Sequence, residues 1–535
     1  MRMGKGTRKQ NFFGGVAVLT AAVVAVKIIS ALYKIPLNNI LDSEGVGHFT
    51  IAYNVYGFLL QLSLAGFPLA LSKLTSEAAA LGRYHQVRRQ FRVAACLFFS
   101  LGATASAVMF FAADPMAAAL NDSLAAEAIR VLSPAVFFVC MVGCCRGYTQ
   151  GLGDMVPTAV SQIIEALCKL VVGLALAWYV LKWLGRPVET GAAAAMFGVT
   201  VGSAAAMVFC LFWMLGRRKE GRSGDRPERR RSILRRLLVI GVPITLGSSV
   251  MSIITLIDQT VVMARLQDAL GLTEQMAAAL YGEYTFGMTL FNLPPTFVYP
   301  VTISMIPAVS AALTRRQGER ARRIVSASFR LVTLLSLPAG VGMSVLAGPI
   351  LQLLYPAVPE TAAAATYHLQ ILGGASVLIC LMLLCNGVLQ AYGRVYIPIA
   401  TACVGGAVKV ASNYVLCGDP AFGIRGAPIS TLLCYGIIAL LDLAAVAWVL
   451  GRNRPGYLRL FAKPAAAAAV MALAARGSFG VLVEAGLSQR LAVMPAILLA
   501  AAVYGVLAIL FRMVTREELA LFPKGEKIAE RLHIR

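Results

Sequence analysis

The chain has 535 residues, of which 59% are hydrophobic and only 14% charged, and its mean hydropathy is +0.75. This composition excludes an ordinary soluble globular protein, because such proteins carry about 25% charged residues. The net charge of +23 does not indicate nucleic-acid binding, because the basic residues gather in short segments between apolar stretches, which is typical of a membrane-topology signal.

The apolar stretches predict an all-α polytopic membrane protein with about fourteen transmembrane helices. A helix of about 20 residues crosses the roughly 30 Å apolar core of a bilayer. The stretches are continuous rather than alternating, which favours helices over the strands of a membrane barrel. The expected spans are 11–33, 48–72, 93–113, 128–150, 156–181, 191–215, 237–264, 282–311, 325–347, 364–391, 396–417, 426–450, 460–475 and 491–512.

The charges of the loops predict the topology. Lys and Arg are retained on the cytoplasmic side during insertion. The loops at 73–92 and 315–323 are strongly basic, whereas loops of opposite parity are acidic, as at Asp114 and Asp122. We therefore expect a multi-pass protein of the cytoplasmic membrane with both termini in the cytoplasm.

A basic segment at 217–236 divides the predicted helices into two groups of six. We interpret it as a flexible cytoplasmic linker that faces anionic lipid headgroups. The expected domains are a first lobe at 1–216, this linker, a second lobe at 237–450, and a final pair of helices with a cytoplasmic tail at 451–535.

The two lobes are predicted to be repeats. Six helices return the chain to the same side of the membrane, so the repeats are parallel, an architecture common in transporters. A shift of 240 residues places Cys145, Gly147, Gln150, Gly153 and Lys169 on Cys385, Gly387, Gln390, Gly393 and Lys409.

Three motifs carry a resemblance to a known family. They are EGVG at 44–47, GFPLALSKL at 66–74 and RGYTQGLGDMVPTAVSQIIE at 146–165. With them, nearly the whole chain resembles the oligosaccharide and lipid II flippases, a MATE-like family of the MOP superfamily that includes stage V sporulation protein B and MurJ-type proteins.

The resemblance implies two six-helix lobes in a V shape around a water-filled cavity that opens alternately to each side. It implies a substrate in which an isoprenoid carrier is joined through pyrophosphate to a sugar or muropeptide, for cell-wall, spore-cortex or polysaccharide synthesis. The last two spans would form a groove for the isoprenoid tail. Lipid II flippases carry an arginine pair in the second helix where this chain has Gln61 and Leu62, which favours the sporulation branch and leaves the headgroup open.

Ionisable residues inside the apolar spans are candidate site residues, because each costs several kcal/mol unless it faces water or a partner. Lys27 and Lys34 lie two helical turns apart on one face of the first span, where they would offer positive charge to a pyrophosphate. The alternative is that Lys34 extends to the membrane interface.

Glu165 and Lys169 have the i, i+4 spacing of a helical ion pair, so they either neutralise each other or contact substrate. In the second lobe, Lys409 precedes Asn413 by one turn and is a candidate partner of Asp258. A lysine here would take the place of the sodium ion that some relatives are implied to bind.

Three further polar residues complete the candidate set. Asn54 and Gln61 are suited to hydrogen-bond sugars from the second span, and Arg146 matches the family motif near a span end, where interfacial positioning is the alternative.

Other function classes fit less well. No catalytic or metal-ligand pattern is present, so we expect no enzyme activity, metal or cofactor. The alternatives are a multidrug or toxin cation antiporter of the same superfamily and a membrane glycosyltransferase or polymerase. The expected partners are a polyprenyl-pyrophosphate-linked saccharide and anionic membrane lipids, with no nucleic acid, and the protein is expected to act as a monomer.

Overall fold

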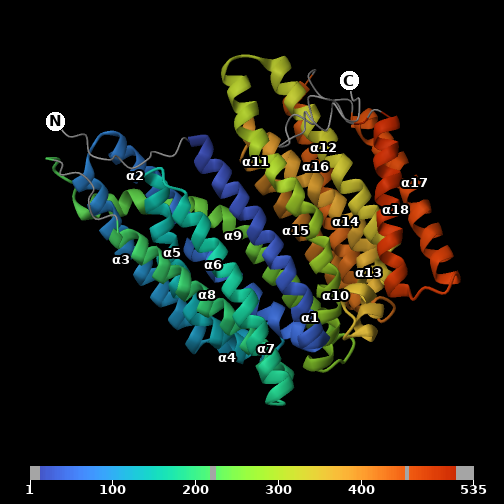
Figure 1. The fold of residues 1–535 in the computed structure, drawn as a ribbon. Helices are drawn as coiled ribbons and strands as arrows, with labels where there is room; N and C mark the ends of the chain where they lie inside the picture. The colour runs from blue at the N-terminus through green and yellow to red at the C-terminus, as the bar shows by residue number, and fades with distance from the viewer. Residues whose placement is uncertain (1–11, 65, 217–223, 452–456, 512, 514–535) are drawn as a thin grey trace. The chain divides into compact units, whose positions relative to one another are not determined.

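A computed structural model describes residues 12–64, 66–216, 224–451, 457–511 and 513, and the regular structure in these ranges is helical (Figure 1). Within them, twelve helical stretches are long and apolar enough to cross a membrane. The prediction of an all-α, multi-pass membrane protein is therefore confirmed. Its termini lie outside the described residues, so their cytoplasmic location stays a prediction.

The difference between twelve stretches and fourteen predicted spans has a local explanation. The first stretch, Ala21–Ala80, covers most of the first two predicted spans, because α1 (Phe12–Leu64) consists of two helices joined without a loop at a kink at Asp42, whose φ is 60° and ψ −176°. The seventh predicted span corresponds to α9 (Arg230–Asp268), which is not among the twelve.

Packing divides the chain into two compact units, 1–282 and 283–535. In the first unit, α5 packs against both α3 and α8, and α1 packs against α5, α6, α8 and α9. Besides α1 and α9, this unit contains α2 (Phe67–Ala80), α3 (Tyr84–Phe111), α4 (Ala113–Ala119), η1 (Ser123–Ala125), α5 (Ala126–Gly151), α6 (Val156–Cys168), η2 (Lys169–Gly173), α7 (Leu174–Trp178), η3 (Tyr179–Trp183), α8 (Val188–Gly216) and the beginning of α10 (Glu274–Phe291).

The second unit is built around α14, which packs against α11, α12 and α16. Its last two helices, α17 and α18, pack on each other, and Tyr504 of α18 donates a hydrogen bond to the Leu334 carbonyl of α12 at 3.1 Å. After α10, the elements are α11 (Leu293–Thr314), α12 (Gly318–Val345), α13 (Ala347–Leu354), α14 (Pro359–Ala391), α15 (Tyr396–Leu416), η4 (Gly423–Arg425), α16 (Gly426–Leu450), α17 (Tyr457–Glu484) and α18 (Gln489–Leu510).

The boundary at residue 282 differs from the lobe boundary expected at the basic linker. Helix α9 belongs to the first unit by its contacts with α1 and α2, and a Cβ added to Gly66 would lie 2.1 Å from the Gly241 carbonyl oxygen. The predicted lobes describe the repeat in the sequence, whereas the compact units describe packing, so the lobe division stays a proposal.

The backbone at the predicted repeat positions is alike in the two units. Helices α5 and α14 end 240 residues apart, and both are followed by a glycine with positive φ, 82° at Gly153 and 76° at Gly393. The amides of these glycines donate to the carbonyls of Gln150 and Gln390 at 2.9 and 3.0 Å. A left-handed residue after a helix C-terminus favours glycine, which explains why this residue recurs.

The described end of the basic linker is bound to helix α3, contrary to the expected flexible segment. The Asp225 carboxylate accepts hydrogen bonds from the backbone amides of His85 and Gln86 at 3.0 and 2.9 Å. The amide of Glu228 donates to the Gln86 side-chain oxygen at 2.7 Å. These bonds satisfy amide groups at a helix N-terminus, which otherwise lack partners. Residues 217–223 lie outside the described ranges.

Candidate functional site

Three of the predicted site lysines form one group in the first unit, here called the cationic cluster: Lys27, Lys34 and Lys169. Lys27 and Lys34 come from α1, and Lys169 begins η2. Lys27 is exposed and the other two are half-buried. The positive charges of Lys169 and Lys27 both act on Lys34. Electrostatic interactions therefore link the three lysines, all of which belong to the first unit.

Two tyrosines hold the Lys169 ammonium. Its Nζ lies 4.7 Å from the centroid of the Tyr33 ring and 4.5 Å from that of Tyr53. Each such cation–π contact contributes about 0.5–2 kcal/mol, more where water is excluded. Phe49 continues the aromatic wall, with ring centroids 6.2 Å from Tyr33 and 6.0 Å from Tyr53. The ammonium is thus oriented without being neutralised, since a ring quadrupole carries no net charge.

A π-helical turn positions Lys169. The helix that starts as α6 widens over η2, and π-helical turns of this kind often occur at functional sites. The turn lies directly against α8, where a Cβ added to Gly198 would lie 2.4 Å from both the Cα and the nitrogen of Gly173. Only a glycine at 198 allows the two backbones to approach this closely.

Of the two interpretations of Glu165 and Lys169, the one in which they form a helical ion pair is wrong. The Glu165 carboxylate instead accepts from the Arg146 guanidinium at 2.9 Å, and Arg146 also donates to the Ser161 hydroxyl at 2.8 Å. The physical reason is that α5 and α6 lie side by side, so Arg146 reaches Glu165 from the neighbouring helix while Lys169 turns to the tyrosines. The positive charge of Arg146 is therefore balanced by the Glu165 carboxylate within the protein.

We predict that Arg146→Gln lowers the free energy of unfolding by about 1–3 kcal/mol, because it leaves a half-buried carboxylate without its charged partner. Thermal denaturation in detergent measures this loss. The double variant Arg146→Gln/Glu165→Gln should recover most of it. As a control, Arg236→Gln breaks more exposed ion pairs and should cost less than about 1 kcal/mol. Equal losses for both single variants would contradict the assignment.

The amide candidates on α1 have different surroundings. Asn54 donates to the side-chain oxygen of Gln259 in α9 at 2.5 Å, and the buried Gln259 nitrogen has no hydrogen-bond partner among the described residues. Gln61 is exposed near the end of α1, and Asp258 is buried. Sequence reasoning missed Gln259, although a polar residue directly after Asp258 in an apolar span is a visible signal.

Two predicted site residues, Lys409 and Asn413, lie on α15 in the second unit. Lys409 is half-buried, and the buried Asn413 oxygen accepts from the Cys417 thiol at 3.6 Å. Because Asp258 belongs to the first unit, its expected pairing with Lys409 stays a prediction. The sequence-based prediction also missed Asp442, which is buried and accepts a hydrogen bond from Thr401 at 2.7 Å.

A buried acid–imidazole pair was also missed. His48 and Asp122 are fully buried, with the ring nitrogen Nδ1 2.7 Å from the carboxylate. Sequence reasoning placed both residues near aqueous boundaries. The signal for close packing was the EGVG motif just before His48, since a Cβ added to Gly47 would lie 2.2 Å from the Ala278 carbonyl oxygen of α10.

The family of the chain follows from a comparison with known protein families. The model of the family described as polysaccharide biosynthesis protein matches residues 12–313, which is more than half of the sequence. The chain belongs to the polysaccharide biosynthesis protein family. A second model, described as MatE, matches residues 243–415 of this family member.

Curated relatives of this family member come from Bacillus subtilis. The uncharacterized membrane protein YabM is 27% identical over 82% of the chain and 80% of its own length. Stage V sporulation protein B is 24% identical over 96% of the chain and 98% of its own length. The lipid II flippase MurJ is 23% identical over 64% of the chain and 65% of its own length.

Solved structures show the same fold. The lipid II flippase MurJ in an inward closed conformation matches with a TM-score of 0.65 and 13% identity, over 94% of the chain and 98% of the other protein. A multidrug resistance MATE transporter of the MOP superfamily in an inward-facing conformation matches with a TM-score of 0.64 and 15% identity, over 81% and 98%. This member of the polysaccharide biosynthesis family therefore has the fold that the MurJ flippase and the MATE transporter share.

Proposed function

We propose that this protein is a flippase that moves an isoprenoid-pyrophosphate-linked saccharide or peptidoglycan precursor across the cytoplasmic membrane by alternating access. The product would serve cell-wall, spore-cortex or polysaccharide synthesis. The observation that carries the proposal is the cationic cluster, in which three ammonium groups share one part of the first unit.

The charge balance of the cluster favours an anion. The ion pairs found in the described part of the first unit do not include these lysines, and Glu165 is bound to Arg146. Like charges held together in a membrane protein are costly unless an opposite charge joins them. A pyrophosphate supplies negative charge and several strong acceptor oxygens, so it would compensate the cluster.

The aromatic wall adds a reason for a sugar-bearing substrate. Tyr53 and Tyr56 continue the row of rings that begins at Tyr33, with the centroids of Tyr53 and Tyr56 5.8 Å apart. Aromatic faces with polar edges suit a ligand that is partly apolar and partly hydrogen-bonding. The isoprenoid tail would lie along α17 and α18, whose exposed apolar side chains include Leu473 and Leu498.

A cation antiporter is the alternative, because the MatE match and the MATE structures share this fold. The cationic cluster is the observation against it, since lysines repel an organic cation. Fold alone does not separate these functions, because one fold hosts different activities.

Copurification tests the proposal. We expect native mass spectrometry of the protein in mild detergent to show a bound polyprenyl-pyrophosphate saccharide. Lys27→Ala/Lys34→Ala should lose this ligand, because two of the three ammonium groups are removed. The control Lys182→Ala changes an exposed lysine of η3 and should retain it. Ligand loss in the control as well, or uptake of organic cations that the cluster variant leaves unchanged, would refute the anionic substrate.

A further inference from the structure

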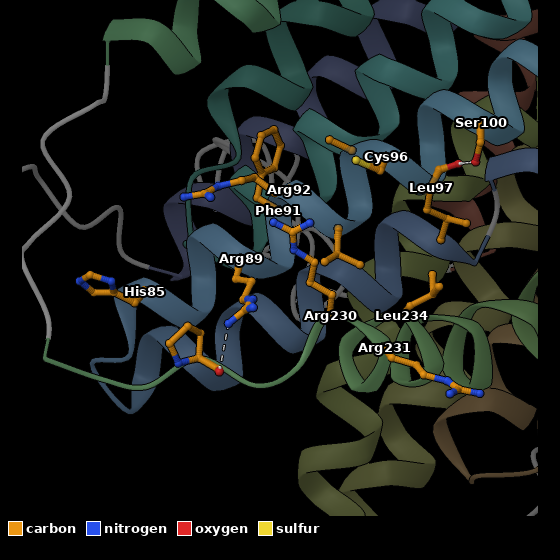
Figure 2. A pocket seen from close by; sticks show the side chains of 13 residues that line it. His85, Arg89, Phe91, Arg92, Cys96, Leu97, Ser100, Arg230, Arg231 and Leu234 are labelled. Atoms are coloured by element: carbon orange, nitrogen blue, oxygen red, sulfur yellow. Dashed lines mark hydrogen bonds between the residues drawn. The ribbon is translucent and has the colours of Figure 1, made fainter.

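A separate pocket lies between α3 and the segment that enters α9, in the first unit. Its volume is about 860 Å³. Figure 2 shows Arg89 and Arg92 of α3 and Arg230 of α9 around this pocket, with Leu97 and Leu234 also in its lining. None of these residues belongs to the cationic cluster.

The wall of the pocket is held in place by hydrogen bonds. The Arg89 guanidinium donates to the Pro227 carbonyl at 3.4 Å, which is drawn as a dashed line in Figure 2. The hydrogen bonds of Asp225 and Glu228 to the first turn of α3 fix the same segment. The pocket therefore lies between α3 and a segment that hydrogen bonds attach to α3.

The charge at the rim is positive. Arg92, Arg230 and Arg231 are exposed at the pocket, and no acidic residue is among those that line it in the described part of the chain. The two acidic residues of the adjoining segment are bound elsewhere, Asp225 to backbone amides and Glu228 to Arg236 at 3.3 Å. Arginines gathered in this way match a phosphate group, which their forked donors bind well.

The lining becomes apolar along α3. This helix is one of the candidate membrane spans, and its residues Val93 and Leu97 line the pocket beyond Arg92. From Arg92 to Ser100, the last lining residue on α3, the rise is about 12 Å at 1.5 Å per residue. The pocket thus extends from a charged rim to an apolar surface, which suits an amphiphile better than a soluble phosphate.

We propose that this pocket binds an anionic glycerophospholipid from the leaflet on the basic side of the membrane, the side that the loop charges predict to be cytoplasmic. The phosphate contacts Arg89, Arg92 and Arg230, and an acyl chain lies along Leu97 and Leu234. Bound there, the lipid bridges α3 and the start of α9. The site is distinct from the proposed transport site and does not depend on its substrate.

Photocrosslinking in nanodiscs tests this proposal with the full chain. The probes are phosphatidylglycerol and phosphatidylcholine, each with a diazirine in an acyl chain, and peptide mapping locates the label. We expect phosphatidylglycerol to label residues 93–100 and the region of Leu234, with much weaker labelling by phosphatidylcholine. Arg92→Gln/Arg230→Gln should lower the labelling by at least about fivefold, because each basic residue near an anionic surface changes affinity by about that factor.

The matched control is Arg315→Gln/Arg323→Gln, which removes two exposed arginines from the second unit. This variant should be labelled as strongly as the wild type. Equal labelling by the two lipids would overturn the proposal even if a variant failed to fold, because that comparison uses only the wild type. Complete displacement of the lipid by excess inorganic phosphate would assign the pocket to a soluble anion instead.

Discussion

Lys169→Ala is expected to reduce flipping of a pyrophosphate-linked lipid by roughly tenfold to a hundredfold, the loss typical of a hydrogen bond to a charged group. The variant removes the one ammonium of the cluster that two tyrosine rings hold in position. Transport by reconstituted proteoliposomes measures the effect, with accessibility of the lipid headgroup to an added reagent as the readout.

The variants around Lys169 separate its charge from its position. Lys169→Arg keeps the charge and the ability to stack on aromatic rings, so it should retain much of the activity. Lys169→Met keeps most of the side-chain volume without charge and should resemble Lys169→Ala. Lys182→Ala serves as the matched control on the same continuous helix. If Lys169→Met transports like the wild type, the ammonium has no part in substrate handling.

The transmembrane helices were predictable because the bilayer imposes a length and an apolar composition on every span. The expected spans 396–417 and 426–450 correspond closely to α15 (Tyr396–Leu416) and α16 (Gly426–Leu450). The glycines that suggested the repeat were also recognisable, because the left-handed turn at Gly153 and Gly393 tolerates few other residues. Such constraints act on local sequence, so a single chain displays them.

The details of the site were less predictable, because they depend on which helices are neighbours. The i, i+4 spacing favoured a pair between Glu165 and Lys169, but a residue of α5 competes for the same carboxylate. The π-helical turn at Lys169 leaves no mark in the hydrophobic pattern. Helix α9 belongs to the first unit because of its packing contacts, and the spacing of repeated residues in the sequence does not predict such contacts.

Gly198 packs against the π-helical turn that carries Lys169, and replacing it by alanine should lower stability rather than raise it. In a helix interior, Gly→Ala normally stabilises by up to about 1 kcal/mol. At Gly198 the added Cβ would lie 2.4 Å from backbone atoms of Gly173, and backbone atoms have little room to yield. We therefore expect Gly198→Ala to destabilise the protein by about 1–3 kcal/mol.

The same substitution should also impair transport. The added methyl group would push the π-helical turn η2 away from α8, and this turn carries Lys169. Thermal denaturation and the proteoliposome assay test the two consequences separately. Gly57→Ala is the matched control, since nothing lies within 4 Å of a Cβ added there, and it should be neutral or slightly stabilising. Transport by Gly198→Ala below that of an equally destabilised variant such as Arg146→Gln would show that the position of Lys169 matters beyond stability. If Gly198→Ala behaves like Gly57→Ala in both assays, the close approach of η2 and α8 does not exist in the membrane.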